Sequence, residues 1–473
     1  MSSKRIPRIR VLQSEIENTH VKRSLQFLLD HREILKPYSD LEEYAFSAPD
    51  PLTKDLKGFE YHFNVVRKQI LQILRYHSIF IGASIVDDLL FTAIRQSAVL
   101  APVKSVLKAI HDNGIHKPGV VLYPLHSFSI AGAGFLEALG KERFDLIIPE
   151  AGMAVRAPTR NLQGTIRFLE QATKQLHIPR WIPSDSLEHY ERMPVLRWLT
   201  HNPLLVVSAR TFSGEYYENQ TFIVLKLKIA TTLIFMLSAL ETGLARKTDA
   251  WTGTGSVNNF QTLDIKHYVV FEPRPRSRSA FESRRVPMNV SPTELSELTA
   301  VPVNITRGTW MRRKKFILGM CSALRTVETG YLKALLTPTN TSAHDRVYRK
   351  LFSSLSYFRR SFRLTADIGE AYVNLAVAFE VLLTDNYASG VDARIRKRLR
   401  KTLKGIKGSR TLNSATRTLY KARSEIVHTG QTKISVDVQR VRQAFVHAFV
   451  HVVNRVQGLS PTSQEPIQTI LGE

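Results

Sequence analysis

An arginine and a histidine near the C-terminus are the residues of this chain best suited to chemistry. Arg423 and His428 lie in the segment YKARSEIVHTG, which covers residues 420–430. An imidazole can move protons near neutral pH, and a guanidinium is always charged and binds phosphate oxygens through paired hydrogen bonds. Side by side, these two groups could cut RNA without a metal. The alternative is structural, because cations favour a helix C-terminus and Gly430 suits the position after the cap.

Helical hydrophobic spacing recurs through the last third of the chain and places this pair at the end of a helix. Tyr372, Leu375 and Phe379 form one apolar stripe, and Val441 and Phe445 belong to another. These stripes predict a small helical bundle. The expected helices cover residues 345–364, 368–383, 392–404, 413–427 and 436–456.

Three segments within this region carry a family resemblance. They are NLAVAFEVLL at 374–383, the basic helix at 394–403 and LYKARSEIVHTG at 419–430. On these segments, residues 341–460 resemble the HEPN superfamily of small helical domains, and within it the Apea-like group. The resemblance implies a metal-independent endoribonuclease in which the ribose 2′-hydroxyl attacks its own phosphate and leaves a 2′,3′-cyclic phosphate. By this resemblance, His428 transfers the proton, and Arg423 stabilises the negative charge of the phosphorane.

The resemblance also implies a homodimer through the C-terminal helical domain, in which two motifs meet in one composite site. Two copies of His428 would then divide the roles of base and acid. The chain departs from the family pattern at Ser424, where Asn, Asp or His is frequent, and at Thr429, where Gly is frequent. Some members of the superfamily bind or scaffold without cleaving, so a non-catalytic module remains the alternative.

Further residues near the motif are candidates for supporting roles. Glu380 is expected beside buried Phe379, where a carboxylate more often orients a neighbouring arginine than acts as a base. Tyr420 and Ser424 flank Arg423 and are included as supporting candidates. We expect no metal and no cofactor.

Two histidines elsewhere invite a metal reading. His447 and His451 are four positions apart on one helix, but no third potential ligand lies at a spacing typical of zinc motifs. A zinc site is therefore not expected at this pair.

The net charge of +25 and the pI near 10.1 predict a polyanionic partner. Between Arg394 and Arg410 the sequence has nine basic residues and no acidic one, while Ile395 and Leu399 keep helical spacing. A face without mixed charges repels itself, which favours contact with RNA phosphates over a merely solvated face. Membrane binding is not expected, because the apolar face is needed for the core. The predicted RNA-binding residues are Arg394, Arg396, Lys397, Arg398, Arg400, Lys401 and Lys404.

The remaining 340 residues predict an α+β region in front of an all-α bundle, giving a mainly helical chain. Expected features are a helix at 14–35, two helices within 61–100, and strands at 117–124, 144–149 and 263–271. Gly132, Gly134 and Gly140 do not have the spacing of a nucleotide-binding loop. The predicted divisions are a basic tail and helix at 1–60, an α+β domain at 61–303 with a basic loop at 273–286, a connecting helical segment at 304–340, the HEPN-like domain at 341–460 and a tail at 461–473.

The compartment follows from what the sequence lacks. Cys321 is the single cysteine, which excludes an internal disulfide and fits a reducing cytoplasm. The basic start is not followed by an apolar signal region, and the apolar run at 229–240 is shorter than a membrane span and predicts a buried helix. We therefore expect a cytoplasmic endoribonuclease, in a bacterial toxin or phage-defence setting, whose first 340 residues sense, restrain or position the nuclease domain.

Overall fold

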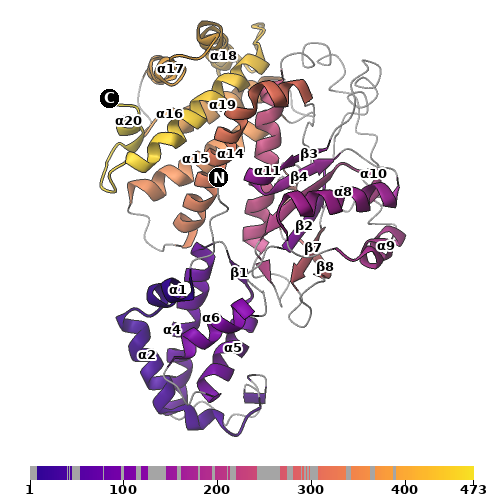
Figure 1. Cartoon of the computed structure of the whole chain (residues 1–473). Coiled ribbons are helices and arrows are strands. Elements are labelled where there is room, and N and C mark those ends of the chain that lie inside the picture. The colour runs from indigo at the N-terminus through magenta and orange to yellow at the C-terminus, as the bar shows by residue number, and fades with distance from the viewer. Residues whose placement is uncertain are drawn as a thin grey trace.

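The computed structural model describes most of the chain. The described residues are 8–39, 41, 43–44, 54–77, 79–96, 101–112, 119–125, 145–156, 161–178, 182–193, 198–209, 211–212, 220–241, 267–273, 281–288, 290–291, 294–295, 298, 307–336, 342–362, 368–386 and 390–473. Within them the chain is mainly helical and contains one antiparallel sheet, as expected from the sequence (Figure 1).

The N-terminal helices pack around a core of their own, drawn in indigo and purple in Figure 1. The expected helix at 14–35 is in fact divided, because the Asn18 side chain accepts a hydrogen bond from the Val21 amide at 3.0 Å and starts a new helix. The predicted division at residue 60 falls inside one helix, and this unit extends to Asp112. Its elements are α1 (Ile9–Ile16), α2 (Thr19–Asp30), η1 (Arg32–Leu35), α4 (Lys54–Tyr76), α5 (Ala83–Gln96) and α6 (Pro102–Asp112).

A six-stranded sheet follows, in the order β3-β4-β5-β2-β7-β8, with every neighbouring pair antiparallel. The expected strands at 117–124, 144–149 and 263–271 correspond to β2, β3 and β7, although residues 263–266 lie outside the described residues. A short parallel pair, β1 (Phe80–Ile81) with β6 (Thr211–Phe212), lies apart from it. The strands are β2 (Gly119–Pro124), β3 (Leu146–Ile148), β4 (Met153–Arg156), β5 (Leu204–Ala209), β7 (His267–Pro273) and β8 (Phe281–Pro287).

Part of the predicted basic loop at 273–286 belongs to the sheet instead. Arg284 and Arg285 lie in β8, where Arg285 contacts the ring of His267 at 3.2 Å. Residues 274–280, with the other arginines of that stretch, lie outside the described residues, as do Gly132, Gly134 and Gly140.

Both faces of the sheet are covered by helices. Val120 and Leu122 point to a core shared with α8 (Leu162–Gln175), α9 (Ser184–Arg192) and α10 (Trp198–His201). Val121 and Tyr123 point the other way, toward α11 (Gln220–Leu240). Every residue of β2 is therefore buried, which explains why this strand has no alternation of apolar and polar residues.

Helix α11 lies between the sheet and the C-terminal helices (Figure 1). Among the described residues, its segment Phe222–Leu240 is the one helix long and apolar enough to cross a membrane. Most of that segment is buried inside the protein, as expected for the apolar run at 229–240. A helix that is apolar all round belongs in a core of this kind.

The C-terminal helices follow the predicted order closely. The helix expected at 368–383 has those ends, and the other predicted bundle helices differ by a few residues. The elements are η2 (Pro149–Ala151) beside the sheet and then α14 (Arg307–Leu336), α15 (Ala343–Arg360), α16 (Ile368–Leu383), α17 (Val391–Thr402), α18 (Ser409–Thr429), α19 (Val438–Arg455), η4 (Val456–Gly458) and α20 (Pro466–Ile470).

The core of this bundle extends beyond the predicted division at residue 341, since one continuous core joins the bundle to α14 and α11. The buried guanidinium of Arg359 donates hydrogen bonds to the Thr232 hydroxyl at 2.8 Å and the Lys228 carbonyl at 3.3 Å, both on α11. The Gln439 amide lies 2.8–2.9 Å from the carbonyls of Ser238, Ala239 and Glu241 and so caps the end of α11. The N-terminal part of the chain therefore helps to build the core of the predicted nuclease domain.

Candidate functional site

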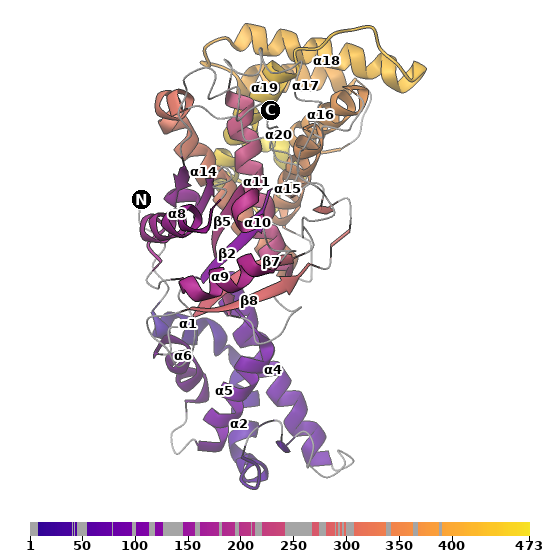
Figure 2. The same cartoon turned by 90° about the vertical axis from the view of Figure 1, so that its right-hand side faces the viewer.

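The Arg423 and His428 motif lies at the end of α18, as the sequence predicts. The helix runs to Thr429, and Gly430 then takes a left-handed conformation with φ of 77°. The Gly430 amide donates to the Ile426 carbonyl at 2.8 Å, so this glycine terminates the helix. Helix α18 lies along the outer edge of the bundle (Figure 2), and most residues from Ser424 onward in it are exposed.

Arg423 lies on the inner side of α18. Its Nη2 atom is 3.8 Å from Oε1 of Glu380, a long separation for an ion pair. Its Nε atom is buried and has no hydrogen-bond partner among the described residues. A guanidinium carries five N–H donors, and the Arg423 side chain is 36% exposed. Its Nη groups, rather than the buried Nε, could therefore donate to an incoming phosphate oxygen.

Glu380 extends from α16 as the acidic neighbour of that guanidinium. Burial raises the pKa of Glu380 above its ordinary value, and the positive charge of Arg423 offsets part of this rise. Glu380 is thus the acidic neighbour of Arg423, but no hydrogen bond joins the two side chains, and the orienting role that the sequence favours stays a prediction.

His428 does not lie beside Arg423 within one chain. They are five positions apart on a regular helix, which places the side chains roughly 140° apart around the axis and about 7.5 Å apart along it. His428 is exposed, whereas Arg423 is half-buried against Glu380. The expectation that the two groups stand side by side is therefore wrong for a single copy, because the helix remains regular through the motif.

The two supporting candidates on α18 differ from each other. The Tyr420 hydroxyl is buried and donates to the Ala376 carbonyl at 3.1 Å, which ties α18 to α16. Burial raises the pKa of Tyr420 well above its ordinary value, and the nearby carboxylates of Glu380 and Asp392 add to the rise. Tyr420 is thus a packing residue rather than a group open to substrate, while Ser424 is exposed.

The seven basic candidates of α17 and its end are not equally available to RNA. Arg398 is 3% exposed, and its Nε and Nη1 donate to Glu473 at 2.8 Å and to the Leu383 carbonyl at 2.6 Å. Lys397 and Lys401 also lie 3.3 and 3.2 Å from the Glu473 carboxylate. The prediction of a surface phosphate contact is therefore wrong for Arg398, whose alignment with the apolar stripe places it in the interior.

The other four candidates of this helix lie nearer the surface. Arg396 is 2.8 Å from Asp392, one helical turn away. Arg394 is partly buried, and Arg400 and Lys404 are exposed. Sequence reasoning missed Glu473 as the partner of Lys397, Arg398 and Lys401, since it lies 72 residues or more from them and no local pattern connects them.

The rest of the described residues offer few alternatives for chemistry. No group of three or more His, Cys, Asp or Glu side chains gathers there as metal ligands would, and His447 instead stacks near Phe316 with ring centroids 4.4 Å apart. Burial lowers the pKa of His447 to about 4, and the charge of Arg313 contributes to this. A partly buried imidazole held neutral in this way is a packing residue rather than a metal ligand.

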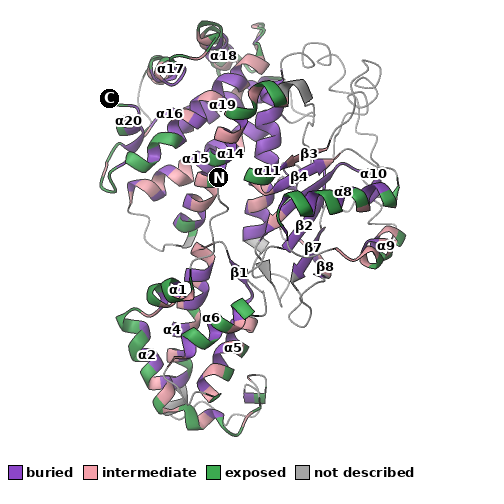
Figure 3. Cartoon of the chain, viewed as in Figure 1, coloured by how far each residue is buried: buried purple, intermediate pink, exposed green. Residues whose placement is uncertain are grey.

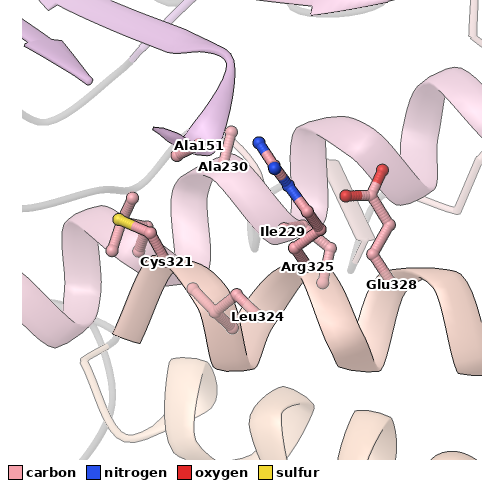
Figure 4. A pocket seen from close by; sticks show the side chains of 8 residues that line it. Ala151, Ile229, Ala230, Cys321, Leu324, Arg325 and Glu328 are labelled. Atoms are coloured by element: carbon pink, nitrogen blue, oxygen red, sulfur yellow. The ribbon is translucent and has the colours of Figure 1, made fainter. Parts of the chain in front are cut away.

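A small hollow between η2, α11 and α14 does not form a ligand site. Figure 4 shows Cys321, Leu324, Arg325 and Glu328 of α14 on one side of it. The space open to the centre of a water molecule is about 10 Å³, which is room for about one water. Burial raises the pKa of Cys321 to about 12, so its thiol is not a nucleophile at neutral pH.

Comparisons with known proteins identify no relative: no family model, curated protein or solved structure matches this chain.

Proposed function

We propose that this protein is a metal-independent endoribonuclease of HEPN type that forms its active site from two copies of α18. The observation that carries the proposal is the half-buried guanidinium of Arg423, which keeps unpaired donors beside Glu380 at a helix end that also presents exposed His428. Free arginine donors suit the charge of a phosphorane, and an exposed imidazole suits proton transfer.

The reaction follows from these two groups. The ribose 2′-hydroxyl attacks the adjacent phosphorus while a His428 imidazole accepts its proton. The bond from phosphorus to the 5′-oxygen of the next nucleotide breaks, and that oxygen receives a proton from the second His428. The products are a 2′,3′-cyclic phosphate and a 5′-hydroxyl, and Arg423 stabilises the charge that develops on the phosphorane.

The geometry of α18 supports a shared site rather than a site within one copy. Arg423 and His428 of one chain point in different directions, so a second copy is needed to bring a guanidinium and two imidazoles to one phosphate. Val427, near the end of the same helix, is 54% exposed. An uncovered apolar side chain at this place supports contact with a second copy across a two-fold axis.

The separation of Arg423 from His428 also favours the second candidate function. A chain whose two motif residues never meet would bind RNA without cutting it, as a binding or scaffold module. The same cleavage assay separates the two functions.

Cleavage of single-stranded and structured RNA in EDTA tests the proposal. We expect specific cleavage by the protein, and loss of at least a hundredfold in rate for His428→Ala, because general acid–base catalysis contributes about 10²–10⁴-fold. The matched control is His111→Ala, since His111 is also an exposed histidine in the last turn of a helix. Binding without cleavage by the unchanged protein would establish the binding module instead.

Mixing two inactive variants tests the composite site. We expect His428→Ala and Arg423→Ala chains, mixed and allowed to exchange, to regain a small part of the activity that His428→Ala lacks alone. The mixed dimer has one Arg423 and one His428, contributed by different copies, and lacks only the second imidazole. Each variant diluted with itself serves as the control. A protein that is fully active while light scattering shows only monomers would exclude the shared site.

A further inference from the structure

The outer face of α18 carries a straight row of three exposed cations that ends at an exposed histidine. Arg410, Arg417, Lys421 and His428 are all exposed. Arg417, Lys421 and His428 follow Arg410 by 7, 11 and 18 positions. At 100° per residue, all four lie within roughly 20° of one line along the helix. The buried side chains of α18, such as Leu419, lie on the opposite face. Figure 3 shows the exposed and buried sides of this helix in green and purple.

The four side chains of this row have no partner within the described part of the chain. No ion pair or hydrogen bond joins the side chain of Arg410, Arg417, Lys421 or His428 to any described residue. Glu425 is the single acidic residue of α18, and it accepts a hydrogen bond from the Thr432 hydroxyl at 2.6 Å. A row of like charges repels itself unless an external anion neutralises it.

We infer that a single-stranded RNA segment lies along this row, with its phosphates on Arg410, Arg417 and Lys421 and its scissile phosphate at His428. The row is about 27 Å long at 1.5 Å per residue, long enough for the few nucleotides that single-strand-binding surfaces contact. This inference rests on the proposed function in assigning chemistry to His428, but the binding path stands apart from cleavage.

The chemistry of the row favours RNA over an anionic membrane surface. Helices that lie in a membrane interface insert large apolar side chains beside their cations. Val427 is the one exposed large apolar side chain of α18, and between the cations the outer face carries the hydroxyls of Ser414 and Ser424. The row also ends at the imidazole of His428, which can transfer protons in RNA cleavage and has no corresponding role in binding a lipid surface.

The test measures equilibrium binding of a 2′-O-methyl single-stranded RNA, which cannot be cleaved, at several salt concentrations. We expect R417E/K421E to weaken binding about tenfold or more and to reduce the slope of log affinity against log salt by about 1.4, since each phosphate contact on a single strand contributes about 0.7. The matched control is K104E/K108E on α6, which reverses two exposed lysines with the same spacing and should leave affinity and slope nearly unchanged.

Three results would overturn the inference. One is an unchanged salt slope in R417E/K421E. Another is an equal or larger loss in R400E/K404E, which would place the path on α17. The last is tighter binding to vesicles containing anionic phospholipid than to RNA, lost in R417E/K421E. Protein that binds along α18 but never cuts natural RNA would refute the endoribonuclease alone, whereas cleavage unaffected by R417E/K421E would refute the path alone.

Discussion

Helices α17 and α18 are both basic, adjacent and packed against the same core, yet they use their cations differently. Three cations of α17, Lys397, Arg398 and Lys401, surround the carboxylate of Glu473. The cations on the outer face of α18 have no partner among the described residues. The denser run of charge therefore stabilises the fold, and the sparser one remains available for a ligand.

This difference shows that the number of cations in a segment does not measure its affinity for RNA. What matters is whether a carboxylate from elsewhere in the chain neutralises them first. A lysine or arginine that is already paired with a carboxylate must give up that carboxylate before it can bind a phosphate. It therefore gains little from the counterions that the phosphate releases. Changing one cation in each helix tests this difference.

The largest effect is expected for the buried cation of α17. Arg398→Met keeps most of the side-chain volume but removes the charge that faces Glu473 and the donor to the Leu383 carbonyl. Losing the two buried hydrogen bonds of Arg398, one of them to a carboxylate, should destabilise the protein by about 2–3 kcal/mol. Urea unfolding followed by circular dichroism measures this.

The matched change on α18 is Arg417→Met, which should alter stability by less than about 0.5 kcal/mol because the side chain is exposed and unpaired. Similar losses of unfolding free energy in Arg398→Met and Arg417→Met would mean that the cations of both helices contribute equally to stability. The difference between the two helices would then disappear.

The sequence was sufficient for the features that depend on local pattern. The apolar stripe of Tyr372, Leu375 and Phe379 predicted the ends of α16, and Gly430 predicted the end of α18, because helix faces and caps are set by near neighbours. The spacing of Arg410, Arg417, Lys421 and His428 was equally readable, since it needs only the helical period. Charge density alone instead favours the run at residues 394–410, which is why the sequence-based prediction named α17 and not α18.

The features that the sequence did not predict depend on contacts between distant segments. Nothing local indicates that Glu473 neutralises Arg398, or that Gln439 caps α11. The continuation of the bundle core into α11, more than 100 residues before the predicted division at residue 341, was not predictable for the same reason. The opposed directions of Arg423 and His428 could have been calculated from the helical period, but only once the helix was known to stay regular to Thr429.

A smaller and pH-dependent effect is expected when the anion of the same cluster is changed. Burial alone would raise the pKa of Glu473, but hydrogen bonds from Arg398, Lys401 and Lys397 outweigh it and lower the pKa to about 2. A lowered carboxyl pKa means that the stabilisation is complete above the ordinary value of 4.5 and is lost as the pH falls toward 2.

Glu473→Gln should therefore reduce stability by about 1–2 kcal/mol at pH 7, and its difference from the unchanged protein should shrink as the pH falls from 4.5 toward 2. Urea unfolding at a series of pH values measures this difference, with Glu465→Gln, an exposed carboxyl near the same end, as the control. A difference that stays constant across this range would show that Glu473 is not held as an anion by α17. Lys397 and Lys401 would then be as free as the cations of α18, and α17 would return as a competing surface for RNA.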